Sequence, residues 1–330
     1  MSGEGHPIFV DELERFAVEV GDPGCAAIAE RLATPLRVAV SGRRGVGRGT
    51  VAHALARAGD LRGTITVTPP WEADVDVYVV ADAVKPEDCD AIAATGRPVL
   101  AVLNKADLIA TTQSGRHPDG PTTAARTRCA TLSSRAGVPV EPLAGVLAVA
   151  ALDDLMDDTV WAALQMLAAQ RPTPAQLRRR LVETLDVFGV AQAVAAISRG
   201  ATRTEIGTML RRLSCIDEVV DKIEALGAQV HYQRVLDAVA DLEVLAVTDG
   251  RVGAFLSRDD TVVARMMAAV DVVEAVGMQV DRRVSAAAHL RRAVEWHRYR
   301  REPVTGVHRA CGADIVRGSL RLWSRVGGST

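Results

Sequence analysis

The feature that most constrains the fold of this chain is a glycine-rich stretch, SGRRGVGRGT, at residues 41–50. The segment before it, residues 36–40, is short and apolar and contains β-branched residues, a pattern that favours a buried strand. The segment after it is interpreted as a helix that extends to about residue 58. A strand, a glycine-rich turn and a helix in this order are the parts of a phosphate-binding loop, so the sequence predicts such a loop here.

Backbone N–H groups line a loop of this kind, and its glycines permit the backbone angles and the close approach that phosphates require. The following helix adds the positive end of its dipole. The glycines fit the pattern G-x-x-x-x-G-K-[ST], but Arg48 stands at the lysine position and Gly49 at the hydroxyl position. Thr50 comes one residue late and is expected to point elsewhere on the helix. The predicted phosphate-loop residues are Gly42, Gly45, Gly47, Arg48, Gly49 and Thr50.

Strands and helices alternate over the first half of the chain, which indicates parallel βαβ units. Further strands are predicted at 65–67, 75–80, 98–103 and 138–140, with a helical lead-in at 8–33 and a polar loop at 111–122. From about residue 175 the apolar residues recur at helical spacing and the strand signal is weak. We therefore predict an α/β domain with a mostly parallel sheet, residues 1–170 including the lead-in, followed by an α-helical domain, residues 171–330.

A second motif, Asn104–Lys105–Ala106–Asp107, directly follows the predicted strand at 98–103. NKxD is the guanine-reading motif of GTP-binding proteins. Its aspartate accepts hydrogen bonds from N1 and N2 of guanine, its asparagine ties the segment to the phosphate loop, and its lysine stem covers the base. Four letters recur by chance, so the position after a buried strand, downstream of a phosphate loop, gives the motif its weight. Asn104, Lys105 and Asp107 are the predicted guanine-binding residues, and a simple surface turn is the alternative.

With these motifs the chain resembles bacterial dynamin-like GTPases. Residues 35–42 are similar to the start of their GTPase domain. Stretches that resemble their helical half are 188–191, 210–217 and 232–238, together with Trp296, Pro303, Ala310–Cys311 and Ser319. The resemblance implies a P-loop GTPase fold, GTP or GDP as the ligand, and association with a second copy or with an active GTPase partner.

The chain departs from that family where magnesium is held. GTPases place D-x-x-G after a strand, whereas the corresponding stretch here is Val67–Thr68–Pro69–Pro70. Only 16 residues, 51–66, separate Thr50 from Val67, which leaves little room for a switch threonine. The candidate for the last guanine-side loop is Leu143–Ala144–Gly145. Because phosphoryl transfer depends on magnesium and lysine, we expect a pseudo-GTPase that binds guanine nucleotide weakly or not at all, with no catalytic residue and no protein ligand for magnesium.

Two alternatives stay open. One is a slow but active GTPase that tethers or remodels membranes, with Thr50 or Asp74 as a substitute metal ligand. The other is a nucleotide-free scaffold, which keeps the fold with an empty site. In the favoured interpretation and in the scaffold alternative the role is regulatory or structural.

Composition and charge narrow the location and the partners. No targeting pattern opens the sequence, no apolar run reaches the roughly 18 residues that span a bilayer, and the five cysteines form no CxxC pair, so a cytoplasmic protein is expected. Residues 281–330 carry 11 arginines against four acids. This basic segment is a candidate for peripheral contact with an anionic membrane, for pairing with the acids at 153, 154, 157 and 158, or for a solvated face. With a net charge of −2 and no recognition motif, nucleic acid is not expected as a partner.

Overall fold

The computed structural model describes residues 5–108 and 121–327, and the chain forms two compact units. The first, called the α/β unit here, is Pro35–Ile223. The second, called the helical unit, joins the residues up to Thr34 with those from Glu224 onward. Each unit therefore has its own core and is described by itself.

This division differs from the ranges predicted from the sequence, 1–170 and 171–330. The N-terminal helix α1 (Gly5–Val20) contacts α13 (Asp259–Ala275), so the lead-in packs with the C-terminal helices. Conversely, α10 (Arg203–Ser214) contacts the helix that follows the last strand and belongs to the α/β unit. Both contacts join segments far apart in the sequence, and periodicity within one segment carries no information about them.

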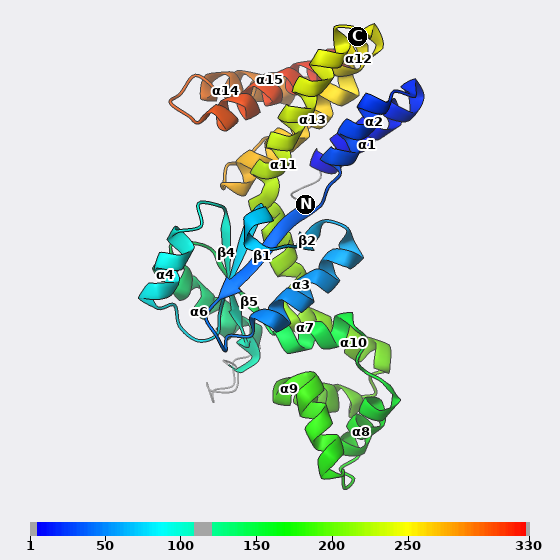
Figure 1. Ribbon diagram of the computed structural model, residues 1–330, viewed down its shortest axis with the longest axis vertical. Coiled ribbons are helices and arrows are strands. Elements are labelled where there is room, and N and C mark those ends of the chain that lie inside the picture. The colour runs from blue at the N-terminus through cyan, green and yellow to red at the C-terminus, as the bar shows by residue number, and fades with distance from the viewer. Residues whose placement is uncertain (1–4, 109–120, 328–330) are drawn as a thin grey trace. The chain divides into compact units, whose positions relative to one another are not determined.

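Five parallel strands form the sheet of the α/β unit, in the order β2-β1-β3-β4-β5 (Figure 1). The strands are β1 Leu36–Gly42, β2 Ile65–Val67, β3 Val75–Val80, β4 Val99–Asn104 and β5 Val140–Leu143. Every residue of β3 and β4 is buried, which is typical of the central strands of a parallel sheet. The predicted α/β class with a parallel sheet is confirmed, although the last strand starts at Val140 and not at the predicted residue 138.

The helices of the α/β unit follow the strands and then continue beyond the sheet. They are α3 Arg48–Arg62, α4 Pro86–Ala93, α6 Pro121–Ala136, α7 Gly145–Leu152, α8 Asp158–Ala168, α9 Ala175–Ile197 and α10 Arg203–Ser214, with a short 3-10 helix at Pro70–Glu72. Buried apolar residues of α7 to α10, Leu147 and Leu185 among them, form one cluster. The predicted loop at 111–122 lies mostly outside the described residues, and its last two residues belong to α6.

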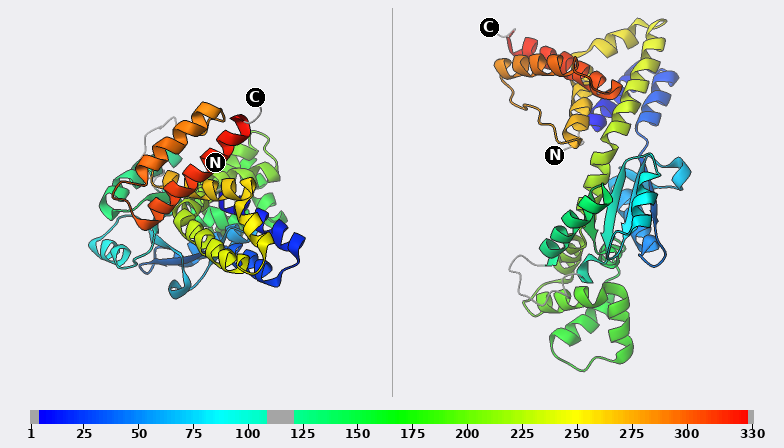
Figure 2. Two further views of the ribbon diagram at one scale, coloured as in Figure 1. Left: turned by 90° about the horizontal axis from the view of Figure 1, so that it is seen from above. Right: turned by 90° about the vertical axis from the view of Figure 1, so that its left-hand side faces the viewer.

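The helical unit consists of helices from both ends of the chain (Figure 2). They are α1 Gly5–Val20, α2 Pro23–Leu32, the later part of α11 Ile216–Ala246, α12 Gly250–Ser257, α13 Asp259–Ala275, α14 Ala286–Tyr299 and α15 Gly306–Gly327. The predicted lead-in with a break near residues 21–24 is confirmed as α1 and α2. The predicted helical periodicity after residue 175 is confirmed as well.

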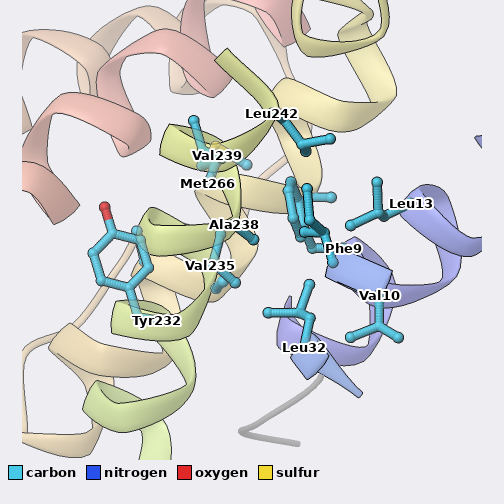
Figure 3. Packing of buried hydrophobic residues seen from close by; sticks show 14 of the residues in the cluster. Phe9, Val10, Leu13, Leu32, Tyr232, Val235, Ala238, Val239, Leu242 and Met266 are labelled. Carbon is cyan, nitrogen blue, oxygen red and sulfur yellow. The ribbon is translucent and has the colours of Figure 1, made fainter. Parts of the chain in front are cut away.

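The core of the helical unit lies between α1, α2 and the later helices (Figure 3). Phe9 and Leu32 pack in one cluster with Tyr232 and Leu242 of α11, and all four side chains are at most 2% exposed. Burial of each such side chain stabilises the fold by about 1.5–3 kcal/mol. Among the helices that the structure describes, none is long and apolar enough to cross a membrane.

The charged segments singled out in the sequence have partners within their own units. In the α/β unit Asp153 accepts a hydrogen bond from Arg57 (2.7 Å), and Asp158 pairs with Arg203 (2.8 Å). In the helical unit Arg325 pairs with Asp259 at 3.1 Å. These contacts account for part of both segments without a pairing between the basic and the acidic stretch.

Candidate functional site

The glycine-rich loop has the backbone that a phosphate-binding loop requires. Gly42, Gly45 and Gly47 have φ values of 137°, 86° and 90°, a region that residues with a side chain rarely adopt. The loop runs from the end of β1 to the first residue of α3. No side chain caps the start of α3 and no acidic residue lies in its first turn, so its N–H groups and positive dipole end are open to an anion.

Asn104 joins three loops at the ends of the strands. Its side chain is 3% exposed, its Nδ2 donates to the carbonyl of Val46 (2.9 Å), and its Oδ1 accepts from the N–H of Gly145 (3.1 Å). A Cβ on Gly47 would lie 2.3 Å from Nδ2, and one on Gly145 would lie 2.8 Å from Oδ1. The two glycines therefore give the asparagine its space, and the contact expected from the NKxD motif is present.

Asp107, the predicted reader of guanine, is almost fully buried and incompletely bonded. It is 7% exposed, and its Oδ2 has no hydrogen-bond partner among the described residues. Burial, with a smaller effect from the nearby carboxyl of Asp186, raises the pKa of Asp107, while Lys105 acts against the rise. A buried acceptor without a donor costs free energy. Two N–H groups of a guanine base would supply such donors.

Arg43 is the one arginine of the loop with a hydrogen-bonded partner among the described residues. Its Nε donates to Asp88 (2.8 Å), and Asp88 also accepts from the hydroxyl of Tyr78 (2.8 Å) and from the N–H of Lys85 (2.8 Å). Burial opposes ionisation of Asp88, but these donors together hold its pKa below the usual value. Arg43 is thus held at the side of the loop, whereas Arg44 and Arg48 are exposed.

The residues that would hold magnesium do not fit that ion. Gly49 offers no side chain, and the Cγ2 of Thr50 is turned toward Gly145, 3.3 Å from where a Cβ would lie on that glycine. The hydroxyl of Thr68, in the stretch where GTPases carry an aspartate, is buried and has no hydrogen-bond partner among the described residues. Within residues 5–108 and 121–327 there is also no group of three or more metal-binding side chains.

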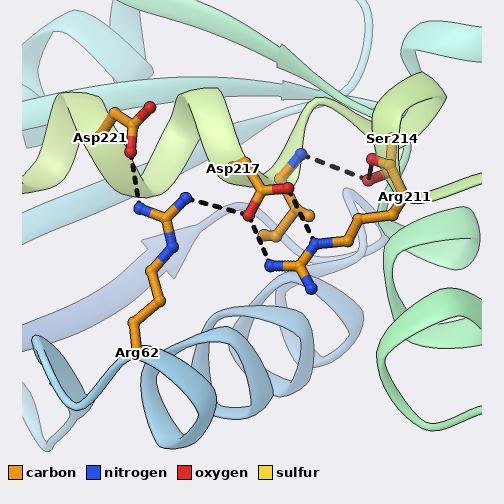
Figure 4. A network of polar contacts seen from close by, with 6 residues as sticks. Arg62, Arg211, Ser214, Asp217 and Asp221 are labelled. Atoms are coloured by element: carbon orange, nitrogen blue, oxygen red, sulfur yellow. Dashed lines mark hydrogen bonds and ion pairs between the residues drawn. The ribbon is translucent and has the colours of Figure 1, made fainter. Parts of the chain in front are cut away.

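A second polar network lies at the other end of α3 (Figure 4). Asp217 of α11 accepts two hydrogen bonds from Arg211 (both 2.8 Å) and one from Arg62 (3.0 Å), and Arg62 also pairs with Asp221 (2.6 Å). Arg62 is the last residue of the helix that begins at the glycine-rich loop. One helix therefore joins the candidate phosphate site to the root of α11 within the α/β unit.

The structure thus brings most of the predicted site residues together, and it adds two that sequence reasoning missed. Gly47, Asn104 and Gly145 meet directly, with Asp107 three residues beyond the asparagine. Asp88 was missed although Pro86 and an acid two residues later mark the start of a helix. Asp186 was missed because nothing in its surrounding sequence marks it.

The helical unit carries a separate pocket of about 880 Å³ beside α14. Leu290 and Val294 line it with Met278, and Arg291 and Arg298 are part of its wall. Leu290 and Val294 are 42% and 45% exposed. Apolar and cationic side chains therefore share one face of the basic segment.

Comparison with known proteins gave no relatives for this arrangement. No protein-family model matches the chain, and no curated protein matches it. A functional interpretation therefore rests on the geometry of the candidate site.

Proposed function

We propose that the α/β unit binds guanine nucleotides and hydrolyses them slowly or not at all. The observation that carries the proposal is the position of Asn104, which bonds both the glycine-rich loop and Gly145 and has the buried, partly unsatisfied Asp107 three residues away. The parts that would receive phosphate and base are thus held in one rigid constellation. Open N–H groups at the start of α3 suit the phosphates, and Asp107 suits the N1 and N2 donors of guanine.

Slow hydrolysis follows from the residues at the phosphate end. Phosphoryl transfer needs charge neutralisation by a metal ion and a compact cation between the phosphates. Gly49 has no ligand atom for magnesium, and the planar guanidinium of Arg48 differs in shape from a lysine ammonium. Binding relies on backbone N–H groups and on Asp107, so it survives these replacements while catalysis does not.

The proposed role is that of a dynamin-like pseudo-GTPase that acts through association with itself or with a GTPase partner. This part rests on the resemblance of the chain to bacterial dynamin-like GTPases. A light-scattering mass of the full chain, measured with and without GDP, tests self-association. A monomer under both conditions would leave the partner as the form of association to test.

For contact with an anionic membrane, the face beside α14 is the one to test. Exposed leucine and valine side chains next to Arg291 and Arg298 are a combination that anionic lipid surfaces attract. Sedimentation with vesicles that contain phosphatidylserine, against vesicles of phosphatidylcholine alone, gives the readout. Replacement of both arginines by glutamine should remove binding, and equal binding to both vesicle types would contradict this assignment.

The nucleotide proposal is tested by calorimetric titration of the full chain with GTP, GDP and ATP, with magnesium and with EDTA. We expect guanine nucleotides to bind, ATP not to bind, and EDTA to have little effect. Asp107→Ala should abolish binding, whereas Asp60→Ala, at an exposed position of the same unit, should leave it unchanged. Absence of binding up to millimolar GTP would favour the scaffold alternative, and phosphate release that Asp107→Ala abolishes would favour the slow GTPase.

A further inference from the structure

Helix α9 is interrupted at one residue beside the candidate base site. Asp186 has φ 58° and ψ 170° in the middle of Ala175–Ile197, a conformation that a residue with a side chain adopts only under constraint from its surroundings. Its own Oδ1 accepts from the N–H of Val187 (2.5 Å), which partly replaces the helical bonding lost at the break.

The packing on both sides of Asp186 supplies the constraint. Leu185 and Phe188 are buried in the cluster that α7 to α10 share. Gly189 approaches α7 so closely that a Cβ there would lie 2.5 Å from Cδ2 of Leu147. The break is thus fixed by tight contacts on a helix that starts at Gly145, the residue bonded to Asn104.

The break places one carboxyl group against another. Asp186 interacts with Asp107 closely enough for their carboxyl groups to share a proton, and Lys105 is the other charged group of the described residues that acts on Asp107. Two carboxylates at such a distance cannot both ionise without repulsion. Asp107 is nearly buried, whereas Asp186 is partly accessible, so the proton shared in the nucleotide-free protein is held at the buried end.

We infer that Asp186 competes with the guanine base for the carboxyl group of Asp107 and so couples base binding to the break in α9. The inference rests on the proposed function. Guanine offers N1–H and N2–H to Asp107, which must then be ionised to accept both hydrogen bonds. The carboxylate of Asp186 opposes that ionisation and must turn away from Asp107 when the base binds. Release of Asp186 removes the constraint at the break, so the segment α8 to α10 senses whether the base is present.

Asp186→Asn is the sharpest variant, because it keeps the shape of the side chain and removes the charge. We expect it to bind GDP about tenfold more tightly than the parent chain, within the range of typical coupling between two sites. Asp186→Gly removes both the charge and the backbone constraint, and should bind at least as tightly. Asp60→Asn, on the surface of the same unit, serves as the matched control and should leave the affinity unchanged.

A second readout needs no nucleotide. The carboxyl carbon of Asp107, assigned with Asp107→Asn and followed by NMR across a pH titration of the full chain, should titrate at lower pH in Asp186→Asn than in the parent chain. An unchanged titration, or equal GDP affinity in parent and variant, would overturn the competition while leaving guanine binding intact. Failure of both proteins to bind GDP or GTP would overturn the competition together with the proposed function.

Discussion

Two buried carboxyl groups, one in each unit, show how differently the two parts of this chain use the same side chain. Asp314 of the helical unit is 3% exposed and accepts hydrogen bonds from the hydroxyl of Tyr232 (2.9 Å) and from Arg265 (3.0 Å), with Arg317 at 3.2 Å. Asp107 of the α/β unit is 7% exposed, and its Oδ2 has no partner among the described residues. The first carboxyl group completes a structure, whereas the second leaves an acceptor available.

This contrast separates structural from functional buried charge. A buried acid with several donors stabilises its surroundings, and its removal leaves those donors unsatisfied. A buried acid without donors destabilises the free protein, a cost that is expected only where a ligand supplies the missing hydrogen bonds. Substitutions at the two acids and at neighbouring positions of both units therefore test the contrast.

Asp314→Ala should destabilise the helical unit by about 3–5 kcal/mol, because it leaves the guanidinium of Arg265 buried without its partner. Denaturant unfolding of the full chain, followed by circular dichroism, measures the change. Tyr232→Phe, which removes one donor and leaves the ion pair, should cost only about 1 kcal/mol. If Asp314→Ala cost no more than Asp107→Asn, the contrast between the two carboxyl groups would be wrong.

The helical unit should also lose stability at mildly acidic pH through His6. Burial is the larger cause and the charge of Arg234 the smaller one by which the pKa of His6 is lowered to about 4, against an ordinary value of 6.5. The unfolded chain therefore binds a proton that the folded unit excludes between these values, and stability falls as the pH decreases from 6.5 to 4. The loss is on the order of 3 kcal/mol.

His6→Gln isolates this effect from the carboxyl groups, which titrate at lower pH. Unfolding curves of parent and variant between pH 7 and pH 4 should converge as the pH falls, since the variant has no imidazole to protonate. His297→Gln, at an exposed position of α14, should keep the pH dependence of the parent chain. Parallel curves for the parent and His6→Gln would show that His6 is not the titrating group.

Gly145→Ala should damage the site more than the fold. The added Cβ would lie 2.8 Å from Oδ1 of Asn104, so the asparagine must shift and both of its hydrogen bonds weaken. Overpacking of this kind costs about 1–3 kcal/mol. Calorimetry should show loss of guanine nucleotide binding in a folded protein. Gly207→Ala has open space around its Cβ and is the matched control.

How far the sequence predicted this architecture differs between local and distant contacts. The strands at 75–80 and 99–104 could be predicted because an uninterrupted apolar run of this length, in a chain with βαβ alternation, is typical of a buried strand. The bond between Asn104 and the glycine-rich loop followed from the motif order. The contact of α1 with α13 could not be predicted, because single-segment patterns do not state which apolar faces meet.

Asp186 shows the same limit within the site. Its break in α9 arises from the packing of Leu185, Phe188 and Gly189 against another helix, and the stretch Leu185–Gly189 contains no proline or other breaker that marks a kink. The local pattern favours an uninterrupted helix, which tertiary packing overrides at one residue. A carboxyl group that faces Asp107 therefore became visible only in three dimensions.

The smallest effect we predict has the opposite sign to the first. Asp107→Asn should stabilise the α/β unit at pH 7 by about 0.5–2 kcal/mol, because it removes a buried charge without a partner and its amide can donate to Asp186. The pKa of Asp107 is raised in the folded state, so its cost is absent below the ordinary pKa of 3.8 and grows as the pH rises through the folded value.

The stability difference between parent and variant should therefore vanish near pH 4 and reach its full size at neutral pH, the reverse of the behaviour of His6. Denaturant unfolding at both pH values gives the measurement, and GDP binding, measured in parallel, should be lost in the variant. A variant that is less stable than the parent at pH 7 would mean that Asp107 already has its donors in the free protein. Asp107 would then be a structural acid like Asp314, and the main argument for a base site in the α/β unit would fall.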